Sequence, residues 1–167
     1  AGAENATDIT ALETANGSGT IDGSALTAIH GTQTQIEQAI ADIDGTDPTN
    51  YNSTLTAGAE NATDITALET ANGSGTIDGS ALTAIHGTQT QIEQAIADID
   101  GTDPTNYNST LTAGAENATD ITALETANGS GTIDGSALTA IHGTQTQIEQ
   151  AIADIDGTDP TNYNSTL

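Results

Sequence analysis

The sequence contains no lysine and no arginine, against 24 aspartates and glutamates, so its formal net charge is −24 at pH 7. Nucleic acids and anionic membrane surfaces attract proteins mainly through lysine and arginine. We therefore expect neither nucleic acid nor an anionic membrane surface as a partner. Cations are the expected counterions and partners of a chain with this charge.

Cysteine is also absent, so no disulfide can brace the fold and the redox compartment cannot be read from the sequence. An active site needs a nucleophile, a base and an orienting group together. Without cysteine, lysine, arginine or a recognisable catalytic motif, we do not expect an enzyme. No apolar run approaches the roughly 20 residues of a membrane-spanning helix, so membrane insertion is not expected.

What the chain does contain is an internal repeat without a single substitution. The segment that begins at Ala1 returns at Ala57 and at Ala113, which gives a period of 56 residues. The repeats are therefore residues 1–56, 57–112 and 113–167, and the third is one residue shorter. A period of this size is typical of solenoids and repeat arrays. We expect the array to continue beyond this segment.

Each repeat has few large aliphatic residues. In the first repeat they are Ile9, Leu12, Ile21, Leu26, Ile29, Ile36, Ile40, Ile43 and Leu55. So little apolar content at high net charge would by itself indicate disorder. The periodic placement of these residues between glycines and capping residues favours a folded unit instead. A solenoid needs less core in each unit, because every unit buries its face on its neighbours.

The first half of the repeat predicts a short helix and then a strand. Residues 5–15 place apolar side chains at helical spacing, with Asn5 or Thr7 available as the N-cap. Gly17 suits the left-handed position after the helix end. The β-branched stretch at residues 20–22 then indicates a short strand between two glycines.

The second half predicts two helices and a second strand. Residues 25–30 are interpreted as one or two helical turns, which end at Gly31. Thr32 and Gln35 have the spacing of a capping box for the next helix, which ends before Gly45. Residues 53–56 alternate as a strand that leads into the next repeat.

Together these elements predict an α/β repeat solenoid with short parallel strands and short helices. Its crossovers would be right-handed, as parallel connections are. The alternative is an all-α helical-hairpin array, in which residues 26–43 and 55–68 each form one helix. Gly31 and Gly58 argue against it, because a glycine costs about 1 kcal/mol in a helix interior.

The string from Asp8 to Ile40 resembles the tandem repeats of very large secreted and surface proteins of aquatic bacteria, of the giant repeat type found in cyanobacteria. Those repeats run Leu-x-x-Leu-Asp, a Thr/Ser-Gly turn, Thr-Val-Asp-Ala-Ser, and then Gly-Thr and a helix. The matching positions here are Ile9, Leu12, Gly19, Thr20, Ile21, Asp22, Ser24, Gly31, Thr32 and Ile36. Gly23 replaces the usual alanine, and residues 44–51 fit no pattern of the family. The resemblance implies an extracellular or cell-surface array of adhesive, matrix or fibre type.

Three of the four asparagines in each repeat stand in the Asn-x-Ser/Thr pattern that N-glycosylation requires. Such patterns also arise by chance in turns that are rich in asparagine and threonine. The candidate glycan sites are Asn5, Asn16, Asn52, Asn61, Asn72, Asn108, Asn117, Asn128 and Asn164.

A calcium ion is the only cofactor that the sequence suggests. Three carboxylates surround a glycine turn in each repeat, and carboxylate oxygens suit Ca²⁺. They are Asp42, Asp44 and Asp47, then Asp98, Asp100 and Asp103, then Asp154, Asp156 and Asp159. A solvated acidic turn is the simpler interpretation. His30 is interpreted as a cap at the end of the predicted helix over residues 25–30.

These observations favour a structural extracellular tandem-repeat protein that forms a fibre, stalk or matrix filament, with self-association along or beside the array and with covalent glycans. A second hypothesis is the spacer of a large adhesin, whose binding domain would lie outside this segment. The threonine pairs at residues 32 and 34 and at residues 54 and 56 also suggest an ice-binding solenoid, although their spacing alternates between 22 and 34 residues.

Overall fold

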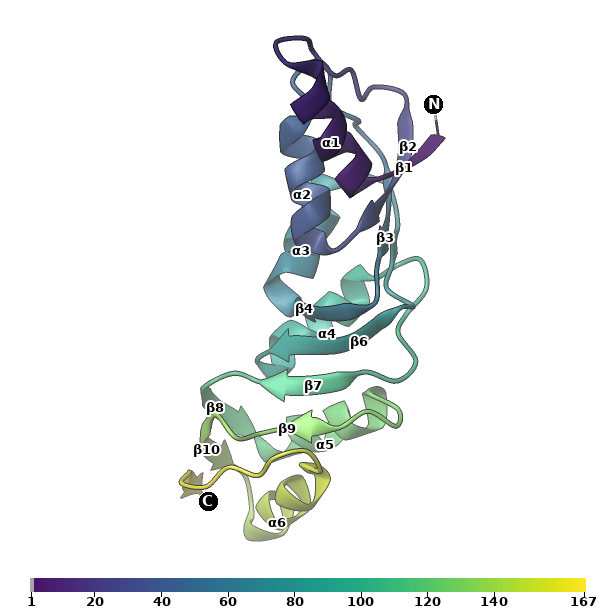
Figure 1. Ribbon diagram of the computed structural model, residues 1–167. Helices are drawn as coiled ribbons and strands as arrows, with labels where there is room; N and C mark the ends of the chain where they lie inside the picture. The colour runs from purple at the N-terminus through teal and green to yellow at the C-terminus, as the bar shows by residue number, and fades with distance from the viewer. Residues whose placement is uncertain (1) are drawn as a thin grey trace. The chain divides into compact units, whose positions relative to one another are not determined.

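The computed structural model describes residues 2–167 and shows an α/β fold in which strands and helices alternate (Figure 1). The first repeat contains β1 (Gly2–Asn5), α1 (Ala6–Asn16), β2 (Leu26–Gly31), α2 (Gln33–Asp42) and β3 (Asn52–Leu55). The second contains β4 (Gly58–Asn61), α3 (Ala62–Ala71), β5 (Ile77–Asp78), β6 (Leu82–Gly87), α4 (Gln89–Asp98) and β7 (Asn108–Leu111). The third contains β8 (Gly114–Asn117), α5 (Ala118–Ala127), β9 (Ile133–Asp134), β10 (Leu138–His142), α6 (Gln145–Asp154) and β11 (Asn164–Thr166).

The strands form three sheets, with the orders β1-β2-β3-β5, β4-β6-β7-β9 and β11-β10-β8. In the first sheet β2 runs parallel to β1 and to β3, and β3 runs parallel to β5. Parallel neighbours require a crossover, which α1 and α2 supply. These two helices pack side by side (Figure 1). Only two residues separate β3 from β4, yet the two strands belong to different sheets.

The chain forms two compact units, and the boundaries of these units differ from the boundaries of the repeats. The first comprises Ala1–Gly58, Asp64–Leu82 and Asp98–Asp103, and the second comprises Ala59–Thr63, Thr83–Ala97 and Pro104–Leu167. Contacts therefore cross the repeat boundary. In the first unit, β5 of the second repeat pairs with β3 of the first.

Several local predictions are confirmed. Helix α1 matches the helix predicted over residues 5–15, and Gly17 follows it with a φ of 68°. Helix α2 begins with the predicted capping box, since the Thr32 hydroxyl accepts from the Gln35 amide and the Gln35 side chain accepts from the Thr32 amide. The strand predicted at residues 53–56 is β3, and the one predicted at residues 20–22 appears as β5 and β9 in the later repeats.

The helical turns predicted over residues 25–30 are wrong, because this segment is strand β2. Its parallel pairing on both sides, with β1 and β3, decides the conformation. His30 consequently lies in a strand opposite Asn5 and Thr54, and the predicted helix-end role for it is wrong. The all-α alternative fails for the same reason, since its two long helices are interrupted by strands.

The sequence does not predict strand β1 or its equivalents β4 and β8. They have the sequence Gly-Ala-Glu-Asn, which contains no β-branched or aromatic residue. Each repeat therefore has more than the two predicted strands. The buried side chains of the first repeat include Ile29 on β2, Leu55 on β3 and Ile36 on α2, so the core lies between the sheet and its helices.

Candidate functional site: the junctions between repeats

A network of polar contacts between repeats joins the end of one repeat to the Asn-Gly-Ser-Gly loop of the next. In the first compact unit the two segments are residues 49–53 and 72–78. The Asn50 side-chain oxygen accepts from the Ser74 amide at 2.9 Å and from the Ser74 hydroxyl at 3.0 Å. The Asn52 side-chain oxygen accepts from the Thr76 amide at 3.0 Å. Two asparagines of one repeat thus hold the loop of the next.

Backbone hydrogen bonds continue the same junction. The Tyr51 amide donates to the Asn72 carbonyl at 3.3 Å, and the Ser53 amide donates to the Thr76 carbonyl at 2.7 Å. Beyond these bonds, Ser53 pairs with Ile77 where β3 meets β5. The contact is therefore an extension of the parallel sheet, with its first part supplied by side-chain amides.

The second compact unit contains the same junction between residues 105–109 and 128–134. Asn106 accepts from the Ser130 amide and hydroxyl, each at 2.9 Å, and Asn108 accepts from the Thr132 amide at 3.0 Å. The backbone bonds of Tyr107 and Ser109 repeat at 3.3 and 2.7 Å. One interface geometry is thus formed twice by the same residues.

The glycines of the loop permit this close approach. Gly73 and Gly129 have φ values of 71° and 72°, in the left-handed region that side chains disfavour. A Cβ on Gly75 would lie on the carbonyl oxygen of Tyr51, and a Cβ on Gly131 would lie on that of Tyr107. No side chain fits at the second glycine of the loop when a preceding repeat is present.

A buried carboxylate makes a further contact between the second and third repeats. Glu116 on β8 accepts from the Gln89 amide, the first residue of α4, at 3.1 Å. A carboxylate is a favourable acceptor at a helix N-terminus, because the first backbone amides have no partner within the helix. Burial raises the pKa of Glu116, the Gln89 amide opposes this change, and the charge of Asp120 adds to it.

Burial also raises the pKa values of Glu69 and Glu125. The carboxylates of Asp100 and Asp98 raise the value for Glu69 further, and Asp156 and Asp154 do the same for Glu125. One carboxylate oxygen of each glutamate is buried without a hydrogen-bond partner. Protonation of these two acids is therefore easier in the folded state than in the unfolded chain.

The aspartates of the acidic turn proposed for calcium make different contacts in the structure. Asp44, Asp100 and Asp156 each accept from a backbone amide, at 2.8, 2.9 and 2.9 Å, and the donors are Ile21, Ile77 and Ile133. Asp42 and Asp154 accept from glutamine side chains of their own helices, and Asp47, Asp103 and Asp159 are exposed. Across residues 2–167, no group of three or more acidic, histidine or cysteine side chains is placed to hold a metal ion. Calcium binding stays a prediction.

The candidate glycan sites fall into two groups. Asn5, Asn16, Asn52, Asn61, Asn108, Asn117 and Asn164 are exposed, whereas Asn72 and Asn128 are fully buried at the two junctions. The Asn-Gly-Ser sequence is thus shielded wherever a repeat precedes it. Its first copy, at Asn16, has no such cover.

A scan of family models found none that matches this chain, and searches of curated proteins and of solved structures found no similar protein. Within residues 2–167, no helix is long and apolar enough to cross a bilayer.

The hydrogen bonds of the junction asparagines predict that the same substitution destabilises the protein in one repeat but not in another. Asn50→Ala removes the acceptor of two hydrogen bonds, whereas Asn162→Ala changes the same residue of the third repeat, which accepts no such bond among the described residues. We expect a loss of about 1 kcal/mol for the first variant and almost none for the second, measured by urea unfolding at low protein concentration. Equal losses would contradict the role of Asn50.

Gly75→Ala should be more damaging than Gly19→Ala. The added methyl group meets the Tyr51 backbone in the first variant but only the Asn16 side chain in the second, which can move. We expect a cost of about 1–3 kcal/mol for Gly75→Ala. Thermal unfolding followed by circular dichroism measures both variants, and a smaller effect at Gly75 than at Gly19 would refute the close approach.

Stability should increase when the pH falls from 7.5 to 5. The folded-state pKa values of Glu69, Glu116 and Glu125 lie above their ordinary value of 4.5. Their contribution is fully present below the unfolded pKa and is lost as the pH rises through the folded pKa. The melting temperature by circular dichroism should therefore be higher at pH 5. Glu116→Gln should weaken this dependence, whereas Glu4→Gln at the exposed equivalent position should not.

Proposed function

We propose that this chain is a segment of an extracellular structural protein, in which identical units stack in one direction as an α/β solenoid and build a fibre, stalk or matrix filament. The observation that carries the proposal is the recurrence of one junction. The hydrogen bonds between the first two repeats return between the last two with lengths that differ by no more than 0.1 Å. A contact that repeats with the same geometry can be extended by every added unit.

The interface supports growth in one direction because its two sides are different surfaces. One side offers asparagine side chains and a strand, and the other offers a glycine-rich loop. Head-to-tail contacts of this kind do not saturate unless the rotation closes a ring. In the proposed filament the mechanism is mechanical: isoleucine and leucine are buried between units, and the threonine-rich acidic exterior stays hydrated.

We place glycans, in this proposal, on the exposed asparagines and not at the junctions. Asn61 and Asn117 are exposed in the interior of the segment and lie outside the junction contacts, whereas Asn72 and Asn128 are enclosed. A sugar at either enclosed residue would block the stacking of repeats. The intact mass of protein from its native source, followed by peptide mapping, locates any glycan, and one on Asn72 in the folded array would contradict this assignment.

An adhesin spacer is the second candidate, favoured by the resemblance to giant surface proteins. It uses the same stacking but assigns recognition to a domain beyond the repeats. A flanking domain in the full-length gene distinguishes it from a filament made of repeats alone.

The filament proposal predicts a rod whose length is proportional to the number of repeats. Arrays of three, six and nine repeats can be imaged by electron microscopy, with the second glycine of every Asn-Gly-Ser-Gly loop replaced by alanine as the matched control. We expect equal length increments in the unsubstituted arrays and their loss in the control. Compact particles with no linear increase in length would overturn the proposal.

A further inference from the structure

Each junction contains an asparagine that is followed by a glycine, at residues 72–73 and 128–129. The backbone nitrogen of the residue after an asparagine can attack the carbon of the asparagine side-chain amide. Glycine is the least hindered residue for this attack, because it has no Cβ and its backbone is the most permissive. The loop that joins the repeats is therefore also a chemically reactive position.

The reaction converts the asparagine to an acid without an enzyme. At residue 72 the Gly73 nitrogen forms a bond to Asn72 Cγ, and the bond from Cγ to Nδ2 breaks. Nδ2 leaves as ammonia and takes the proton of the Gly73 amide, which leaves a cyclic imide. Water then adds to one of the two imide carbonyls. Opening of the ring gives aspartate from one carbonyl and isoaspartate from the other.

The closed junction holds the peptide group that would have to rotate in this attack. Asn128 has a ψ of −1°, which directs the Gly129 nitrogen away from the Asn128 side chain. The Asn128 carbonyl accepts from the Gly131 amide at 3.1 Å and from the Tyr107 amide of the preceding repeat at 3.3 Å. This carbonyl and the Gly129 nitrogen belong to one planar peptide group, so rotation towards Cγ breaks both bonds.

The junction of the first two repeats has the same bonds. The Asn72 carbonyl accepts from the Gly75 amide at 3.2 Å and from the Tyr51 amide at 3.3 Å. Asn72 and Asn128 are both 0% exposed, so the water that opens the imide has no access to either side chain. In the third repeat, Asn128 Nδ2 also donates to the Gly131 carbonyl at 3.2 Å. Geometry and burial thus both oppose the reaction.

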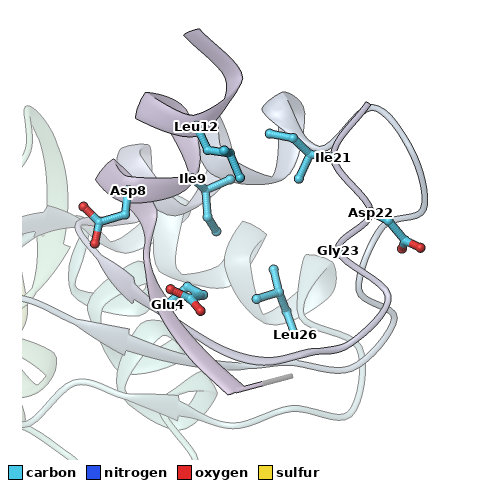
Figure 2. A pocket seen from close by; sticks show the side chains of 8 residues that line it. All are labelled: Glu4, Asp8, Ile9, Leu12, Ile21, Asp22, Gly23 and Leu26. Carbon is cyan, nitrogen blue, oxygen red and sulfur yellow. The ribbon is translucent and has the colours of Figure 1, made fainter. Parts of the chain in front are cut away.

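The first repeat shows the same surroundings without a preceding repeat. Ile9 and Leu12 of α1 face Ile21 and Leu26 across an open hollow (Figure 2), and Asn16 is exposed. In the second and third repeats the equivalent apolar residues are buried; they are Ile65, Leu68, Ile77 and Leu82, and Ile121, Leu124, Ile133 and Leu138. A preceding repeat therefore completes both the apolar cover of the loop and its hydrogen bonds.

We propose that Asn72 and Asn128 are sites of spontaneous deamidation, which a closed junction prevents and an opened junction permits. Either product places a carboxylate at a residue that is fully enclosed in the closed junction. A buried charge requires a partner, and the chain has no lysine or arginine to supply one. A junction that reacts while it is open therefore cannot close again in the same way. This holds for a filament and for an adhesin spacer alike.

Incubation of the 167-residue chain at mildly alkaline pH tests the protection, because base removes the amide proton and accelerates the attack. Ala81→Ser, at an exposed residue, gives the second repeat its own mass. Cleavage after glutamate releases residues 70–93, and mass spectrometry of this peptide follows deamidation at Asn72 alone. We expect the rate in the folded chain to be at least about tenfold lower than in concentrated urea, because local opening must come first.

Two junction variants that carry the same Ala81→Ser mark show whether opening limits the reaction. Asn50→Ala removes two hydrogen bonds from the junction that encloses Asn72, and Asn106→Ala removes the equivalent bonds from the other junction. Asn50→Ala should raise the rate at Asn72 about fivefold, since it increases the population of the open junction. Asn106→Ala is the matched control and should leave this rate unchanged.

Asn72→Asp reproduces one of the two products and tests the consequence of the reaction. Its melting temperature, measured by circular dichroism, should fall below that of the unsubstituted chain by more than about 4 °C. Ala81→Asp adds the same charge at an exposed residue and should have little effect.

Three results would overturn the proposal on the rate of deamidation: equal rates in the folded chain and in urea, no reaction in urea, or equal acceleration by the two junction variants. Equal melting temperatures of Asn72→Asp and Ala81→Asp would refute the proposed consequence, that a junction which has reacted does not close again. Neither outcome depends on whether longer arrays form rods, so these experiments are independent of the filament.

Discussion

The structure depends on the contact between the end of one repeat and the Asn-Gly-Ser-Gly loop of the next. Its hydrogen bonds continue the parallel pairing of β3 with β5 past the end of the regular strand, through the side chains of Asn50 and Asn52. The second glycine of the loop leaves no room for a side chain. Because a single repeat has few large aliphatic residues, burial between neighbours supplies the apolar cover that the repeat lacks alone. Stability in such an array is therefore largely a property of the junction.

The absence of lysine and arginine determines how the carboxylates are used. They satisfy backbone amides instead of basic side chains: Asp44 holds the Ile21 amide, and Glu116 holds the first amide of α4. These bonds connect segments that are far apart in the sequence and compensate in part for the repulsion among 24 acids. The same acidity adds like-charge repulsion between neighbouring repeats, and salt screens such repulsion between exposed charges.

The local elements with strong signals were predictable from the sequence. The capping box of Thr32 and Gln35 located α2, and the glycines correctly separated the helices. The helical turns predicted over residues 25–30 are wrong because Leu-Thr-Ala-Ile-His-Gly has no decisive preference, and its strand conformation is imposed by β1 and β3. Strand β1 was missed because Gly-Ala-Glu-Asn lacks every usual strand residue. The junction asparagines were also missed as a site, since only the fold brings Asn50 to Ser74 across 24 residues.

Because the three repeats have identical sequences, any structural difference between them comes from the neighbouring repeats. The dipeptide Ile-Asp is a strand in β5 and β9 but not at residues 21–22, and the same leucine is exposed in the first repeat and enclosed in the next two. Sequence alone therefore does not determine the conformation at residues 21–22: the strand forms where a preceding repeat supplies its partner. Pairing and apolar burial arise together at that surface, so each added unit completes the structure of the one beside it. The strand and the apolar cover of a repeat thus depend on its neighbour as well as on its own residues.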